Sequence, residues 1–295
     1  MKMGILCSGN LGFTVLSQLS KERTVAFVFT DRGSTDIINF CEKHNIPFFA
    51  GNPRGGKADK FIQKHKLNVH CADVIASVNY LFIIDSQIIN LASKLAFNVH
   101  GSLLPRYRGR TPHVWSIINN EKYTGITAHV IDEGCDTGDI IQQVKISIDP
   151  CDTGATILEK YSIQYLPLIR SVLMTIESDN VQLSKQDNTI ATYFGKRTAA
   201  DGLINWNWQK ERIYNWVRAQ AHPYPGAFTF IGSEQFIIDE VRYHDHGFDY
   251  TVDNGTVLCL DPLVVKVSNG CLEITKYRSD LTKVKLKSKF GDENR

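Results

Sequence analysis

Two polar residues, Asn98 and His100, interrupt an otherwise apolar segment at residues 95–100. If this segment is a β-strand, side chains two positions apart point to one face of the sheet, so the amide and the imidazole can converge on one atom. An amide N–H can donate to a developing oxyanion, and an imidazole, with an unperturbed pKa of about 6.5, can accept a proton from a nucleophile. The alternative is structural: Asn98 caps a turn, and His100 is a half-buried, hydrogen-bonded histidine.

A second polar cluster, the loop 132–139, contains four acidic residues and two glycines that allow backbone to approach a ligand. A carboxylate from this loop would orient a neighbouring imidazole and raise its pKa, which strengthens it as a base. The loop could equally be a solvated turn in which aspartate side chains cap backbone N–H groups.

The elements that must position these groups follow an α/β pattern, because short β-branched runs alternate with segments of helical period. Strands are predicted at residues 4–7, 24–30, 46–49, 73–78 and 95–100. This order predicts a Rossmann-like, mostly parallel sheet flanked by helices. Asn98 and His100 then lie at the carboxyl end of a strand, the edge at which ligand sites of open α/β sheets are found.

A strand, loop and strand are predicted over residues 123–148, followed by a long helix from Gly154 to about Glu177 with Asp152 or Thr153 as its N-cap. The polar stretch 184–201 is the best candidate for a linker. We therefore divide the chain into a catalytic domain at 1–185, a linker at 186–204 and a small, β-barrel-like domain at 205–295.

The last part of the chain predicts one helix and then alternating strands, with two Asn-Gly turns at 254–255 and 269–270. The helix is expected at 209–220, and the strands at 227–231, 236–243, 256–260, 263–267 and 272–277. Such a series of short strands suits a small, OB-like barrel.

Gly9 and Gly12 close the first predicted strand and open a helix whose N-terminal N–H groups could hold an anion. The full GxGxxG spacing is missing, and no acidic residue is convincingly placed for a ribose. A plain tight turn is therefore favoured over a dinucleotide site.

Composition excludes several classes of protein. The 295 residues, 43% hydrophobic and 22% charged, are enough for a substantial core and exclude a miniprotein or a disordered tail. The net charge of +2 provides no whole-molecule attraction for nucleic acid or an anionic membrane. Seven scattered cysteines without a CxxC pair argue against a disulfide framework or zinc ribbon, and no apolar run approaches about 20 residues. We expect a cytoplasmic protein.

Three segments together resemble a known family: the run from Asn98 to Pro105 (NVHGSLLP), the RYRGR loop at 106–110, and the DTGD run at 136–139. They are similar to the motifs of formyltransferases that use 10-formyltetrahydrofolate, especially methionyl-tRNA formyltransferase and the sugar-nucleotide N-formyltransferases. The resemblance implies that Asn98 stabilises the oxyanion and that His100 removes the amine proton or stabilises the charge beside it. It also implies that Asp136 positions His100 or relays its proton onto the departing folate nitrogen. No metal is needed.

The resemblance also implies a folate pocket lined by two short segments. Its residues would be Asn79, Tyr80, Leu81, Phe82, Asp132, Glu133 and Gly134. A non-catalytic folate or nucleotide-sugar binding protein on the same scaffold is the alternative, but it would have no use for a base beside an oxyanion donor.

Two acceptors compete, an amino sugar carried on a nucleotide diphosphate (dTDP- or UDP-linked, for surface polysaccharide) and charged initiator tRNA. Residues 205–295 contain 12 basic against 12 acidic residues, whereas a tRNA-binding domain should be basic. Lys283, Lys285, Lys287 and Lys289 alternate as on one strand face, which is more typical of a solubilising edge. The sugar nucleotide is therefore favoured over nucleic acid, with Arg108, Arg110 and Arg218 for its phosphates and Tyr224 for its base. Strand edges in the second domain could also pair two copies into a homodimer.

Overall fold

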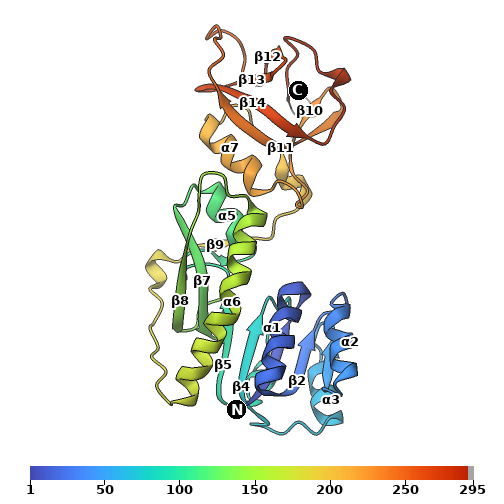
Figure 1. Ribbon diagram of the computed structural model, residues 1–295, viewed down its shortest axis with the longest axis vertical. Helices are drawn as coiled ribbons and strands as arrows, with labels where there is room; N and C mark the ends of the chain where they lie inside the picture. The colour runs from blue at the N-terminus through green and yellow to red at the C-terminus, as the bar shows by residue number, and fades with distance from the viewer. Residues whose placement is uncertain (292–295) are drawn as a thin grey trace. The chain divides into compact units, whose positions relative to one another are not determined.

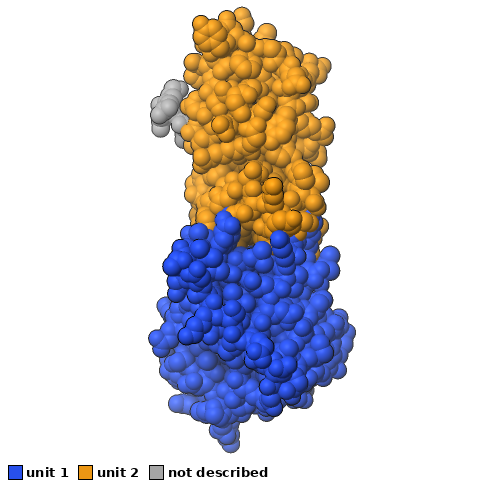
Figure 2. All heavy atoms as spheres, turned by 90° about the vertical axis from the view of Figure 1, so that its left-hand side faces the viewer, with its two compact units in different colours: residues 1–109, 125–146, 160–193 blue, residues 110–124, 147–159, 194–295 orange. Residues whose placement is uncertain are grey.

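The computed structural model describes residues 1–291 and divides the chain into two compact units (Figure 2). Unit 1 consists of residues 1–109, 125–146 and 160–193, and unit 2 of residues 110–124, 147–159 and 194–295. The long elements β7 (Tyr123–Val130), β8 (Ile140–Ser147) and α6 (Gly154–Glu177) each run through a boundary between the units. Each unit is described by itself.

Unit 1 is built on a seven-stranded sheet with the order β3-β2-β1-β4-β5-β7-β8 (Figure 1). The pairs β2–β3, β1–β2, β1–β4 and β4–β5 are parallel, and β5–β7 is antiparallel. The strands are β1 (Lys2–Cys7), β2 (Thr24–Thr30), β3 (Phe48–Ala50), β4 (Ala72–Val78), β5 (Ala92–His100), β7 (Tyr123–Val130) and β8 (Ile140–Ser147). The buried runs of β1, β2 and β4 reflect a sheet with helices on both faces.

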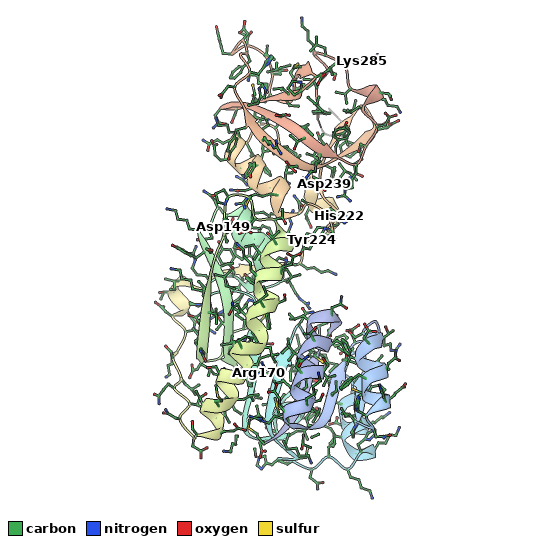
Figure 3. The ribbon with its side chains drawn as sticks, viewed as in Figure 1. Asp149, Arg170, His222, Tyr224, Asp239 and Lys285 are labelled. Atoms are coloured by element: carbon green, nitrogen blue, oxygen red, sulfur yellow. The ribbon has the colours of Figure 1, made fainter. Side chains whose placement is uncertain are left out.

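The helices of unit 1 are amphipathic and bury one stripe each. In α1 the buried residues Gly12, Val15, Leu16 and Leu19 recur at helical spacing. The helices are α1 (Gly9–Glu22), α2 (Thr35–Lys43), α3 (Lys57–Lys64), α4 (Ser86–Ile89) and α6 (Gly154–Glu177). One core cluster joins Phe61 of α3 and Ile88 of α4 to the strand residues Leu6, Phe27 and Phe29. The C-terminal half of α6 is tied to the end of α1 by the Arg170–Glu22 ion pair (Arg170 is labelled in Figure 3).

Unit 2 contains α5 (Pro112–Ile118), α7 (Lys210–Ala219) and a five-stranded antiparallel sheet with the order β10-β11-β14-β13-β12. Its strands are β10 (Ala227–Ile231), β11 (Glu234–His244), β12 (Val257–Leu260), β13 (Leu263–Val267) and β14 (Gly270–Tyr277). Ile213 and Val217 of α7 pack into the sheet's core together with Phe236 and Phe290. The β13–β14 hairpin turns at Ser268 and Asn269, one residue before the predicted Asn269-Gly270 turn.

Short elements complete the structure. A two-stranded sheet pairs β6 (Arg108–Gly109) with β9 (Tyr193–Phe194). The 3₁₀ turns are η1 (Asn188–Ile190), η2 (Ala199–Gly202) and η3 (Leu281–Lys283). No helix in residues 1–291 combines the length and the apolar character needed to cross a membrane.

The predicted fold class is confirmed, with a mostly parallel, helix-flanked sheet followed by an antiparallel β-domain. The predicted strand carrying alternating lysines at 283–289 is wrong. This segment is η3 followed by turns, and Lys287 has a left-handed φ of 65°. Val284 and Phe290 anchor it in the core of unit 2, while Lys283 and Lys289 pair with Glu234 and Asp253 (Lys285 is labelled in Figure 3). Tertiary anchoring of two apolar residues therefore overrides the local alternation.

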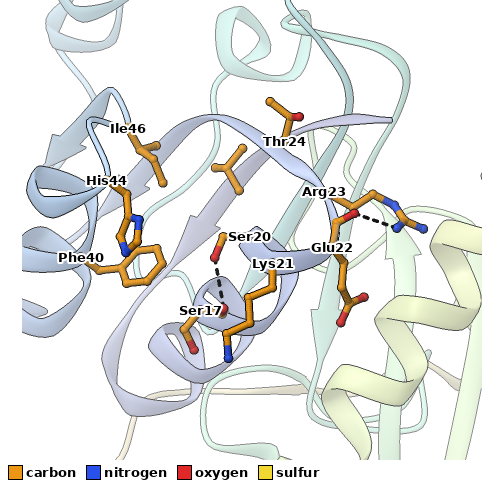
Figure 4. A pocket seen from close by; sticks show the side chains of 10 residues that line it. Ser17, Ser20, Lys21, Glu22, Arg23, Thr24, Phe40, His44 and Ile46 are labelled. Atoms are coloured by element: carbon orange, nitrogen blue, oxygen red, sulfur yellow. Dashed lines mark hydrogen bonds between the residues drawn. The ribbon is translucent and has the colours of Figure 1, made fainter.

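A hollow of about 590 Å³ lies at the amino end of β2, between the C-terminal ends of α1 and α2 (Figure 4). It is lined by Ser17, Ser20, Lys21, Glu22, Arg23, Thr24, Val25, Phe40, His44 and Ile46. Since the polar cluster around His100 lies at the carboxyl ends of the strands, this hollow is separate from it.

Candidate functional site

Antiparallel pairing of β5 with β7 builds the centre of the site. Its register sets Asn98 directly opposite His129, and His100 directly opposite Thr127. Residues opposite each other on neighbouring strands project to the same face, so four polar side chains gather beside the carboxyl end of β5. Phe97 and Val99, which alternate with them along β5, are buried on the other face. The predicted common face of Asn98 and His100 is thus part of a larger polar cluster.

His100 is buried, with only 8% of its surface exposed, and both ring nitrogens have partners. Nε2 lies 2.8 Å from the carbonyl oxygen of Tyr107, which can only accept a hydrogen bond, so Nε2 carries the proton of the neutral ring. Nδ1 then presents a lone pair and lies 3.5 Å from Oδ1 of Asp136. This tautomer places the proton-accepting atom next to the carboxylate.

Asp136 lies in the loop between β7 and β8 and has a left-handed φ of 57°, a region in which aspartate is tolerated. Its Oδ2 accepts a hydrogen bond of 2.9 Å from the Gly109 N–H. Its Oδ1 lies 3.5 Å from the rings of both His100 and His129. Burial opposes ionisation, but the contacts with His129, His100 and the Gly109 N–H outweigh it and hold the pKa of Asp136 below its usual range.

Burial lowers the pKa of His100, and the Asp136 carboxylate only partly offsets this effect. At neutral pH the site therefore combines an ionised carboxylate with a neutral imidazole. A proton accepted at Nδ1 would be stabilised at once by the adjacent carboxylate. Such a charge arrangement is compatible with a general base beside an orienting carboxylate.

His129 is a fourth member of the site, which the sequence analysis missed. Its Nδ1 lies 2.9 Å from the Val130 carbonyl and so carries the ring proton, leaving Nε2 to accept a 3.2 Å hydrogen bond from the Asn98 amide. One N–H of Asn98 is thereby fixed, and its second N–H is left for a ligand oxygen. The sequence signal was a single histidine near the end of the apolar strand predicted at 125–131, but the register of β5 on β7 is needed to pair it with Asn98.

The residues predicted to line a folate pocket lie in two segments of unit 1. Asn79 follows β4, and its amide donates to the Ser8 carbonyl at 3.0 Å. Tyr80 and Phe82 pack edge to face, and Leu81 is 42% exposed. In the other segment, Asp132, Glu133 and Gly134 are exposed, and Asp132 accepts hydrogen bonds from Thr137 and the Gly134 N–H. The structure thus offers an apolar segment after β4 and a polar loop after β7.

The residues predicted to bind the acceptor are divided between the units. Arg108 belongs to unit 1 and is buried among side-chain acceptors. Arg110, exposed in unit 2, pairs its backbone N–H with the Phe194 carbonyl. Arg218 donates to the backbone carbonyls of Asp149 and Asp152, and the Tyr224 hydroxyl lies 2.8 Å from Nε2 of His113 (Asp149 and Tyr224 are labelled in Figure 3).

Comparison with known proteins gives a consistent result for both parts of the chain. Residues 1–165 match the family described as formyl transferase, and residues 196–288 match the formyl transferase C-terminal domain. The structure is similar to the sugar 3N-formyl transferase WlaRD, solved with dTDP and 5-N-formyl-THF, with a TM-score of 0.70 and 21% identity over 95% of this chain and 99% of that one. It is also similar to an N-formyltransferase from Helicobacter canadensis, solved with folinic acid and dTDP-3-aminofucose. That match has a TM-score of 0.68 and 20% identity and covers 94% of this chain and 100% of that one. A 4-N formyltransferase from Francisella tularensis matches with a TM-score of 0.63 and 21% identity over 77% and 91% of the two chains.

Proposed function

Since the chain belongs to the formyl transferase family and is a folate-dependent formyltransferase, we propose that it transfers the formyl group of 10-formyltetrahydrofolate to the primary amine of a nucleotide-linked amino sugar. The observation that carries the proposal is the contact between His100 Nδ1 and the Asp136 carboxylate, beside the amide of Asn98. The dTDP and dTDP-sugar found in two structural neighbours support the choice of acceptor.

The first step is attack of the amine nitrogen on the formyl carbon, which forms a C–N bond and a tetrahedral carbon bearing an oxyanion. The N–H of Asn98 that His129 does not use is the donor for this oxyanion. A correctly placed donor of this kind contributes roughly 10²- to 10³-fold in rate. His129 supports it by holding the amide plane in one orientation.

The second step is collapse of the tetrahedral carbon, which breaks the bond to the folate nitrogen. Nδ1 of His100 accepts the proton that the attacking amine must lose, and Asp136 stabilises the resulting imidazolium. The departing folate nitrogen needs a proton, which the imidazolium can return. The proton balance is closed because one proton leaves the amine and one reaches tetrahydrofolate.

Neutral charge in the C-terminal part of the chain also favours a compact acceptor. The count of 12 basic and 12 acidic residues at 205–295 contrasts with the basic surface expected of a tRNA-binding domain. A nucleotide diphosphate is a small dianion that needs only a few cations. A role in surface-polysaccharide synthesis would follow from such a product.

The test is incubation of the purified protein with 10-formyltetrahydrofolate and a panel of dTDP- and UDP-linked 3-amino and 4-amino sugars, followed by mass spectrometry. Gain of one formyl group by at least one sugar nucleotide is the expected result. Charged initiator tRNA is the comparison substrate. Formylation of the tRNA with every sugar inert would overturn the proposed acceptor class while leaving the formyl-transfer chemistry in place.

A further inference from the structure

Arg108 is the largest fully buried side chain in the described part of the protein, with 1% of its surface exposed. Its guanidinium donates to neutral groups: Oε1 of Gln186 at 3.1 and 2.7 Å, Oδ1 of Asn188 at 2.8 Å, and the hydroxyl of Tyr193. A buried charge is costly unless hydrogen bonds satisfy it, and here uncharged acceptors do so. An arginine held in this way is directed at the protein's own segment 186–193.

Gln186 connects this arginine to the loop of Asp136. Of residues 182–190, Gln186 is the one that is not exposed. Its Nε2 donates to the carbonyl oxygens of Asp136 at 2.9 Å and Gly138 at 2.7 Å, while its Oε1 accepts from Arg108. Both ends of the amide are therefore used. Because hydrogen bonds in a chain polarise one another, the guanidinium strengthens Nε2 as a donor to the loop.

The loop needs such support because its own conformation is constrained. Asp136 has a left-handed φ, and residues 132–135 before it are exposed. A Cβ at position 138 would lie 2.0 Å from the Val130 carbonyl oxygen, so only glycine fits there. Contacts from outside the loop hold the part that carries Asp136: the Gly109 N–H donates to the Asp136 carboxylate, and the Gln186 amide donates to the backbone carbonyls of residues 136 and 138.

We propose that Arg108 and Gln186 are positioning residues that hold the backbone of Asp136 so that its carboxylate stays against His100. This inference rests on the proposed function, because it assumes that the Asp136–His100 contact serves formyl transfer. The proposal assigns a role to Gln186, the first residue of the segment predicted to be a linker. It also explains why the Arg108 guanidinium is buried and hydrogen-bonded within the fold.

The experiment uses Gln186→Met in the full-length protein, which keeps the volume but removes the donor to the two loop carbonyls and the acceptor for Arg108. We expect kcat to fall by about 10- to 100-fold, since small displacements of a reacting group have effects of this size. The KM values for both substrates should stay within about threefold. Gln142→Met is the matched control, because this half-buried glutamine of β8 instead accepts from Ser171. Its kcat should equal that of the wild type.

A second measurement requires no acceptor substrate. Titration of His100 followed by NMR should show a lower pKa in Gln186→Met, because the carboxylate that favours the imidazolium moves away. If Gln186→Met does not fold, Gln186→Glu provides the test. It keeps an acceptor for Arg108 but cannot donate to the two carbonyls, so a folded protein with reduced kcat is again expected.

The two proposals fail differently. Wild-type kcat and an unchanged His100 titration in a folded Gln186 variant, with Asp136→Asn inactive, would overturn the positioning role alone. Full activity in Asp136→Asn would overturn the proposed function and the inference together.

Discussion

Replacing Asp136 with asparagine is the sharpest test of the site, because the amide has the same shape but no charge. The amide oxygen can still accept the Gly109 N–H, so the loop should keep its anchor. The amide N–H₂ would then face His100, where a donor occupies the lone pair of Nδ1 that must accept a proton. The substitution therefore removes the stabilising charge and also blocks the base.

The size of the effect follows from the 3.5 Å separation of His100 Nδ1 and Asp136 Oδ1. With an effective dielectric constant of about 20, two unit charges at that distance attract by about 5 kcal/mol. Allowing about 1 kcal/mol for the amide dipole that remains, the imidazolium loses about 4 kcal/mol. If the transition state carries most of that charge, kcat should fall roughly 10³-fold.

The assay is steady-state formyl transfer to the acceptor identified in the panel, with folding checked by circular dichroism and urea unfolding. Asp139→Asn, in the same loop, is the control and should keep wild-type kcat. Retention of more than about a tenth of kcat by a folded Asp136→Asn protein would refute the role assigned to the carboxylate.

Three further predictions concern neighbouring groups. His129→Ala should lower kcat by about 10-fold with little change in KM, since the Asn98 amide loses its fixed orientation; an unchanged kcat would remove His129 from the site. Because burial lowers the pKa of His100, the pH profile of kcat/KM should be level at neutral pH and fall only below about 6.5. In Asp136→Asn this fall should begin at a still lower pH. A fall that begins above pH 7 would contradict the assignment of His100 as the base. Gly138→Ala should reduce both kcat and the free energy of unfolding, because the methyl group of the alanine would collide with the Val130 carbonyl. The free energy of unfolding should fall by about 2 kcal/mol or more. A urea midpoint equal to that of the wild type would contradict the close packing at this position.

Much of this protein was predictable because its determinants are local. The observed strands 24–30, 227–231 and 263–267 coincide with the predicted ones, since β-branched runs ended by turn residues specify a strand within a few positions. The i, i+2 relation of Asn98 and His100 likewise depends only on the pleat of one strand. The long helix beginning at Gly154 and the Asn-Gly hairpin of β13 and β14 follow from equally short patterns.

Other features depend on which segments meet, and the tertiary structure decided them. His129 joins the site through the register of β5 on β7, and a one-residue slip would turn it to the opposite face. Arg108 and Gln186 are both polar residues in polar stretches, where the sequence favours exposure; they turn inward because each satisfies the other's hydrogen bonds. The segment 283–289 is the opposite case: its alternating lysines predict a strand, but burial of Val284 and Phe290 gives the segment a different conformation. Sequence alone specified the chemical groups and the strands that carry them. Only the fold could specify their partners, because burying a polar group requires contacts from distant parts of the chain.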